Sequence, residues 1–146
     1  MPRIEQKVSA ELENIDEALK LIPGDIQNLS TLELAGLGAV LHSVYNGIEN
    51  ILKQTLKEQR FEIPDGTFWH RDLLDAAVNS GIISRAVFER IKEYMAFRHY
   101  FAHAYALNLK PERMRPLVES APQLIQDFRL DLIRNGIALG AVQKPE

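Results

Sequence analysis

Apolar residues recur at spacings of three and four along most of this 146-residue chain, and this period is the feature that most restricts its fold. Such spacing places apolar side chains on one face of an α-helix, whereas a half-buried strand alternates with a period of two. The clearest example is a heptad seam formed by Leu34, Leu37, Leu41, Val44, Ile48 and Ile51. Because every strong periodicity is of this kind, the chain is predicted to be all-α.

Capping residues, glycines and prolines divide the chain into four long helices and one short one. The expected helices cover about residues 8–22, 31–60, 69–79, 84–107 and 117–134. Ser30 and Glu33 form a capping box at the second helix, and Ser84 should cap the fourth. Thr67 or Asp65 is expected to cap the short helix, after the turn at residues 64–66.

Prolines and glycines also make predictions about the connections and contacts. Pro111 and Pro116 should limit the last connection, and Pro122 should kink or restart the final helix. The glycines along the heptad seam are expected to let another backbone approach closely; they are Gly36, Gly38 and Gly47.

Helices joined by short turns favour an antiparallel bundle of four to five helices. We expect one domain over residues 1–136 and a flexible tail over 137–146. The heptad seam could lie in the core of one chain or between two copies in a homodimer, since periodicity alone does not separate these.

Composition excludes several classes of protein. Cysteine is absent, which rules out disulfides, a thiolate nucleophile and a cysteine-based zinc site. The sequence contains no secretory signal pattern, and no apolar run approaches the roughly 18 residues of a membrane span. A cytoplasmic protein with no membrane association is expected.

The charge is distributed unevenly. The net charge of −3 argues against general affinity for polyanions. Residues 84–115, however, contain seven basic and three acidic residues, a local charge of +4 that leaves −7 for the remainder. A solvated helix face could give the same count, so this region is either an ordinary polar surface or the one part of the chain suited to a polyanion.

Arg98 stands out within that region. The fourth helix should carry a broad apolar face made of Val87, Phe88, Ile91, Tyr94, Met95, Phe101 and Ala102. Arg98 projects from the middle of this face, where a charge costs several kcal/mol unless it is paired or solvated. Two interpretations follow: a pair with a buried acid such as Glu49 or Asp72, or a functional site.

The functional interpretation joins Arg98 to His103. An imidazole exchanges protons near neutral pH, and a fixed guanidinium can hold a phosphate and stabilise charge in the transition state. Attack by a ribose 2′-hydroxyl on the adjacent phosphodiester needs little more, and it restricts the substrate to RNA. Tyr45 and Asn46 interrupt the apolar surface of the second helix and could face the same cleft.

A resident metal is not expected. His99 and His103 have the four-residue spacing that can bring two imidazoles to one ion, but the glutamate of a helical metalloprotease motif is missing between them. A third ligand could come from His42 or His70 only through the fold. No cofactor is predicted.

The string Arg98-x4-His103-x-Tyr105 resembles the Arg-x4-His-x-Tyr motif of HepT-like toxins, which belong to the HEPN superfamily of small helical ribonucleases. The order of helices follows that family through nearly the whole chain. One position is less typical, because the family most often has a small polar residue such as Asn where this chain has His99.

This resemblance implies a homodimer in which Arg98 and His103 of both copies line one cleft. It implies a metal-independent endoribonuclease that leaves a 2′,3′-cyclic phosphate, with His99, Tyr105, Tyr45 and Asn46 in supporting or RNA-contacting positions. It also implies a partner, a minimal nucleotidyltransferase antitoxin that adenylylates Tyr105. The alternative is a non-catalytic HEPN-like module that docks a nucleotidyltransferase or a nucleotide.

Overall fold

A computed structural model describes residues 3–103 and 108–139 of the chain. Within these ranges the chain forms five α-helices and no strand, which confirms the all-α prediction. The helices are α1 (Ile4–Leu19), α2 (Thr31–Glu58), α3 (Trp69–Asn79), α4 (Arg85–His103) and α5 (Pro111–Arg134).

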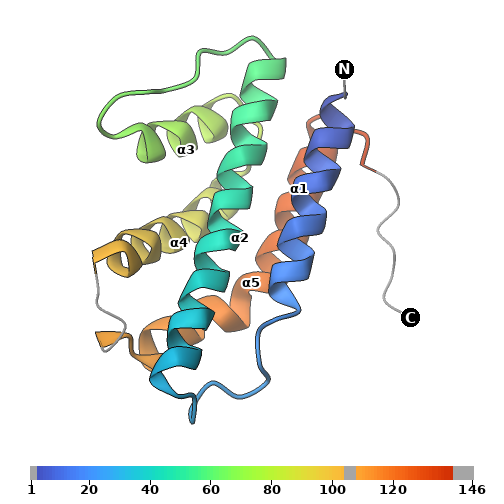
Figure 1. The fold of residues 1–146 in the computed structure, drawn as a ribbon. Coiled ribbons are helices and arrows are strands. Elements are labelled where there is room, and N and C mark those ends of the chain that lie inside the picture. Colours follow the sequence, from blue (N-terminus) through green and yellow to red (C-terminus); the bar gives the residue numbers. More distant parts are fainter. Residues whose placement is uncertain (1–2, 104–107, 140–146) are drawn as a thin grey trace.

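The long helix α2 is central, because it contacts each of the other four helices. In Figure 1, α1 runs alongside α2, while α3 and α4 extend across the opposite side of α2. An ion pair between Arg129 of α5 and Asp16 of α1, at 3.2 Å, joins the outer helices. The ends of α3 and α4 that lie farthest from α1 face the same side of the molecule (Figure 1).

The heptad seam lies in the core of the single chain. All six of its side chains are at most 9% exposed without a second copy, and those from Val44 onward are fully buried. Burying an aliphatic side chain of this size contributes about 1.5–3 kcal/mol, so these residues stabilise the fold of one chain. The alternative placement of the seam between two copies is therefore not needed.

Two of the three seam glycines make a close approach possible, although to side chains rather than to backbone. A Cβ at Gly47 would lie 2.6 Å from Ile15 of α1, and a Cβ at Gly38 would lie 2.5 Å from Phe101 of α4. A Cβ at Gly36 would meet nothing within 4 Å, so the expectation is wrong for this residue.

The predicted cap of α2 is confirmed, and the predicted cap of α3 is wrong. The Ser30 hydroxyl accepts from the Glu33 amide at 3.1 Å, and the Glu33 carboxylate accepts from the Ser30 amide at 2.9 Å. Helix α3 begins at Trp69 after an N-cap residue, Phe68, that makes no side-chain cap. Neither Thr67 nor Asp65 occupies the capping position, because Phe68 directly precedes the first residue of the helix.

The final helix begins earlier than predicted and does not restart. Pro111 occupies its first turn, where a missing amide hydrogen has no cost, and both Pro116 and Pro122 lie inside the continuous helix. Both interior prolines are exposed, whereas Met114, Leu117, Leu124 and Phe128 on the other face are buried. Burial of that face outweighs the weak helix propensity of proline.

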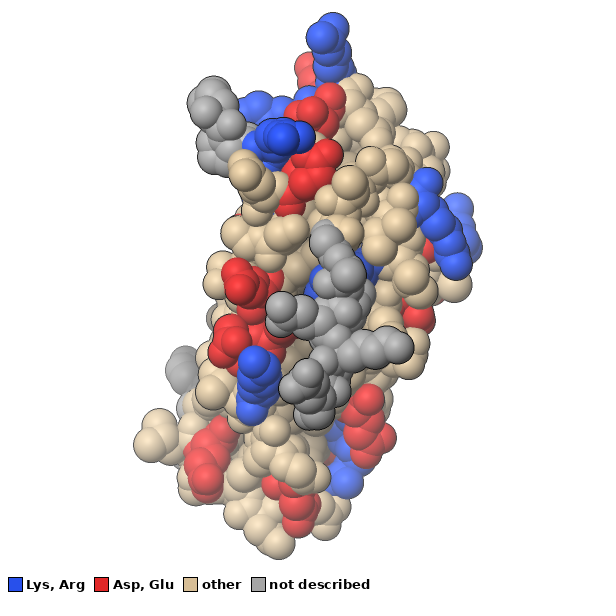
Figure 2. All heavy atoms as spheres, turned by 90° about the vertical axis from the view of Figure 1, so that its right-hand side faces the viewer, with Lys and Arg blue, Asp and Glu red and all other residues tan. Residues whose placement is uncertain are grey.

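The surface mixes charges of both signs. On the face formed by α1 and α5, acidic and basic side chains alternate with uncharged ones where the view is coloured (Figure 2). Among the helices described, none combines the length and the apolar character of a membrane span. After α5 the side chain of Ile137 is still buried in the core, and residues 140–146 of the expected tail lie outside the described ranges.

Candidate functional site

The position of α4 is fixed at its N-terminal end by Ser84 and Asp131. The Ser84 hydroxyl accepts from the Val87 amide at 3.2 Å, which confirms the predicted cap. The amide and hydroxyl of Ser84 also donate to the buried carboxylate of Asp131, at 2.8 and 2.9 Å. Because Asp131 belongs to α5, this cap attaches the start of α4 to another helix.

Aromatic packing fixes the other end of α4. Phe101 lies against Gly38 of α2, and its ring stacks on Phe97 with the ring centres 5.9 Å apart. On the other side, the centre of the Phe101 ring lies 5.8 Å from that of His42. The second half of α4 is thus held directly against α2, and a side chain on its inner face must meet α2.

The apolar face of α4 differs from the prediction at two residues. Phe97 is buried, although it was not among the residues predicted for the apolar face. Ala102 was predicted for this face, but it is exposed and does not belong to it. The helix has 3.6 residues per turn, so Phe97 and Phe101 are neighbours on one side and Ala102 lies a further 100° around the axis. Arg98 does lie beside this face and is half-buried.

Arg98 has no acidic partner among the described residues. None of the ion pairs or hydrogen bonds between described residues involves it, and its Nε atom is buried without a partner. Glu49, one of the two acids considered for it, is 3% exposed and has its carboxylate at Nδ1 of His70 instead. Asp72, the other, is exposed. Leaving a buried donor unpaired costs about 1–3 kcal/mol.

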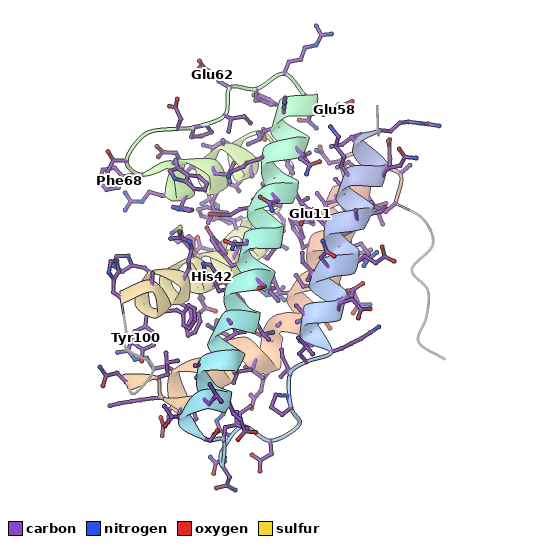
Figure 3. All side chains as sticks on the ribbon, viewed as in Figure 1. Glu11, His42, Glu58, Glu62, Phe68 and Tyr100 are labelled. Carbon is purple, nitrogen blue, oxygen red and sulfur yellow. The ribbon has the colours of Figure 1, made fainter. Side chains whose placement is uncertain are left out.

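Four polar residues lie on one face of α2, namely His42, Tyr45, Asn46 and Glu49, and the charge of Arg98 acts on the first two. Their spacing of three, four and seven places them on one side of the helix. Figure 3 shows His42 on the side of α2 that faces α4. Two of the four, Tyr45 and Asn46, are candidates from the sequence, and the amide nitrogen of Asn46 lies 3.5 Å from Nδ1 of His42.

The hydroxyl of Tyr45 is a second buried polar atom without a hydrogen-bond partner in the described part of the chain. Burial raises the pKa of Tyr45, and the nearby Glu49 carboxylate raises it further through a side-chain hydrogen-bond interaction and through its charge, while the charge of Arg98 opposes the shift. The phenol therefore stays protonated at neutral pH. The buried phenol lies within electrostatic range of the half-buried Arg98, and the Tyr45 hydroxyl and the Arg98 Nε have no hydrogen-bond partner within the described residues.

His42 is the site residue that the sequence reading missed. Burial lowers the pKa of His42 and the positive charge of Arg98 lowers it further, while Glu49 raises it. The ring is thus favoured in its neutral form beside the guanidinium. The available signal was the helical spacing of His42 from Tyr45 and Asn46, although only the fold relates that face to Arg98.

The two histidines of the motif region lie apart from these buried groups. His99 and His103 are both exposed, and their ring centres are 4.6 Å apart with an angle of 59° between the planes. In one chain, side chains five residues apart on a helix differ by about 140° around the axis and by about 7.5 Å along it. Arg98 therefore points toward α2 while His103 points to solvent. Tyr105 lies outside the described residues.

A metal cluster is absent from the described residues, in which no three potential histidine, cysteine or carboxylate ligands come together. His42 and His70 thus do not complete a site with His99 and His103. The described geometry offers a guanidinium, a protonated phenol and a neutral imidazole at the contact between α2 and α4, with two imidazoles on the adjacent surface. Such a set can bind an anion and exchange protons.

Comparison with known proteins gives a family and a fold. A family model described as HepT-like protein matches residues 36–135, a range that contains α3, α4, α5 and all of α2 except its first five residues. Among solved structures, YutE from Bacillus subtilis, described as a cytosolic protein of unknown function, is similar with a TM-score of 0.66. The two are 16% identical, over 88% of this chain and 87% of YutE, so this likeness concerns the fold alone. No curated protein matches the sequence.

Proposed function

Since the chain belongs to the HepT-like family, we propose that it is a metal-independent RNA endonuclease and the cytoplasmic toxin of a toxin–antitoxin pair. The observation that carries the proposal is the unpaired Arg98. Its buried Nε and the buried hydroxyl of Tyr45 both lack an acceptor or donor within the described chain. A phosphate oxygen would satisfy both, because it accepts hydrogen bonds and carries the opposite charge to the guanidinium.

The proposed reaction is transesterification within the RNA strand. His103 removes the proton from a ribose 2′-hydroxyl, whose oxygen attacks the neighbouring phosphorus. The bond from phosphorus to the 5′-oxygen breaks, and that oxygen takes a proton from a second imidazole. Arg98 stabilises the additional charge on the non-bridging oxygens. The products are a 2′,3′-cyclic phosphate and a 5′-hydroxyl end.

A homodimer would bring the two kinds of group together. Within one chain Arg98 lies against α2 and His103 lies on the exposed side of α4. We propose that two α4 helices meet, so that each His103 approaches the cleft of the other copy. His99, Tyr45 and Asn46 would then support the bound RNA, and the second imidazole would be His99 or the other copy's His103.

Tyr105 is the proposed point of control. It follows His103 by two residues, so a group attached to it would lie close to the reacting phosphate. An adenylate added there by a minimal nucleotidyltransferase antitoxin would bring bulk and negative charge into the cleft and repel RNA. Co-expression with the candidate antitoxin should increase the intact mass by multiples of one adenylate, and the Tyr105→Phe variant should show no increase.

Cleavage of RNA by the purified protein tests the nuclease. The parent should leave 2′,3′-cyclic phosphate ends with or without EDTA, and Arg98→Ala or His103→Ala should abolish both cleavage and growth arrest. Arg90→Ala is the matched control. Arg90 lies on the same helix as Arg98, but its guanidinium pairs with Asp127 of α5 at a distance of 2.7 Å.

The alternative function makes a different prediction. A non-catalytic HEPN-like module would bind a nucleotidyltransferase or a nucleotide but would not cut RNA. Cleavage that persists unchanged in both the Arg98→Ala and His103→Ala variants would contradict the proposed nuclease. Binding of the nucleotidyltransferase by a protein that leaves RNA intact would favour the module.

A further inference from the structure

The exposed histidine pair at the end of α4 has the arrangement of a two-imidazole metal site. His99 and His103 are one helical turn apart, and their ring centres are separated by 4.6 Å. No described residue forms a hydrogen bond or ion pair with either ring, and both side chains are exposed. Their nitrogens are therefore accessible to an ion from solution. The other two histidines differ, because His70 is paired with Glu49 and His42 is half-buried.

The separation of the rings agrees with a shared metal ion. A nitrogen–metal bond is about 2.0–2.1 Å, which places the ion about 3.2 Å from the centre of each ring. Two such rings at angles between about 90° and 109° at the metal have centres about 4.5–5.2 Å apart. The observed 4.6 Å lies within this range. Cu²⁺ and Ni²⁺ favour imidazole ligands and tetragonal geometries, in which neighbouring ligands are at right angles.

We propose that His99 and His103 bind a divalent transition-metal ion, Cu²⁺ or Ni²⁺ in preference to Zn²⁺, with water in the remaining positions. With only two protein ligands the ion exchanges readily, so the site differs from the resident metal centre that the sequence argues against. Bridging residues one turn apart also restrains the last turn of α4. Binding therefore stabilises the folded chain.

The position of the site gives it a consequence for the reaction, which rests on the proposed function. A metal ion occupies the lone pair of an imidazole, and that nitrogen can then no longer accept a proton. If His103 removes the proton from the 2′-hydroxyl, the bound ion stops cleavage. The ion thus acts as an inhibitor of an enzyme that needs no metal, and a chelator reverses the effect.

Calorimetric titration of the untagged protein with NiCl₂ and with CuCl₂ tests the site. We expect one ion per chain, and we expect His99→Gln and His103→Gln each to weaken binding at least tenfold. The matched controls, His42→Gln and His70→Gln, should bind the ions as the parent does. Circular dichroism of each variant tests whether the helices are intact. We expect them to be intact in the variants at 99 and 103, because both side chains are exposed.

The proposal is overturned if the variants at 99 and 103 bind Ni²⁺ and Cu²⁺ as tightly as the parent, or if the two controls lose as much affinity. RNA cleavage is then measured with saturating NiCl₂ and after addition of EDTA. Loss of cleavage that EDTA restores supports inhibition, and full cleavage at saturation refutes it. If the metal-free protein does not cut RNA, the proposed function fails, and the binding titrations still decide the metal site.

Discussion

Replacing Arg98 by methionine should make the protein more stable. The Nε of Arg98 is buried without a partner in the described part of the chain, and such an atom costs about 1–3 kcal/mol. Methionine has a similar length and no polar hydrogen, so it removes this cost while keeping most of the contacts of the arginine stem. After some loss of packing, we expect a gain of about 1–2 kcal/mol in the free energy of unfolding.

Urea denaturation measures this gain. With a slope of about 2 kcal/mol per molar urea, the midpoint should rise by about 0.5–1 M. Protein concentration must be held constant, because a dimer would make the midpoint depend on it. The same variant should lose RNA cleavage, since a more stable site without its cation cannot hold the phosphate.

Arg90→Met is the matched control for this measurement. Arg90 donates to Asp127 at 2.7 Å, and both side chains are 33% exposed. Loss of a partly exposed pair should cost about 0.5–1 kcal/mol, so the midpoint should fall. If Arg98→Met lowers the midpoint as Arg90→Met does, then Arg98 has a stabilising partner and the argument for an open site is refuted.

Two further predictions concern the contact between α2 and α4. Gly38→Ala should lower the free energy of unfolding by about 1–3 kcal/mol, because the new Cβ would lie 2.5 Å from Phe101. Gly36→Ala should raise it by about 0.4–1 kcal/mol, because a Cβ there meets nothing within 4 Å. Equal thermal midpoints for the two variants would contradict this. In NMR titration, Arg98→Gln should raise the pKa of His42, since it removes a positive charge that lowers it. Because the pKa of His42 is lower in the folded chain than its ordinary value of 6.5, stability should decrease as the pH falls through 6.5, and His42→Gln should flatten this dependence.

The helices of this protein could be predicted from sequence because each has a local apolar period. The capping box of α2 and the Ser84 cap of α4 were also readable, since each depends on residues three positions apart. The start of α5 could not be predicted in this way. Local propensity places a break at Pro116, but the buried face that keeps the helix continuous packs against distant segments. Tertiary burial decided this boundary, and no short window of sequence contains it.

The candidate site was predictable only in part, for a similar reason. Arg98 could be recognised because it breaks an apolar face within its own helix. Whether it has a partner depends on Glu49, and Glu49 is taken by His70, which lies 21 residues further along the chain. This pair forms because α3 crosses α2 at that point. The sequence indicates which acids could lie near an arginine, but it does not show which of them already has another partner.

The same limit explains why His42 was missed, and it bears on what the site is for. The polar residues of α2 have a regular helical spacing, but only the fold shows that this face lies toward Arg98 of α4. At their contact the Tyr45 hydroxyl and the Arg98 Nε both remain buried and unpaired among the described residues. Apolar residues at either position would make a more stable chain. Both costs would end if an acceptor entered from outside, and the RNA phosphate of the proposed function is an acceptor of this kind.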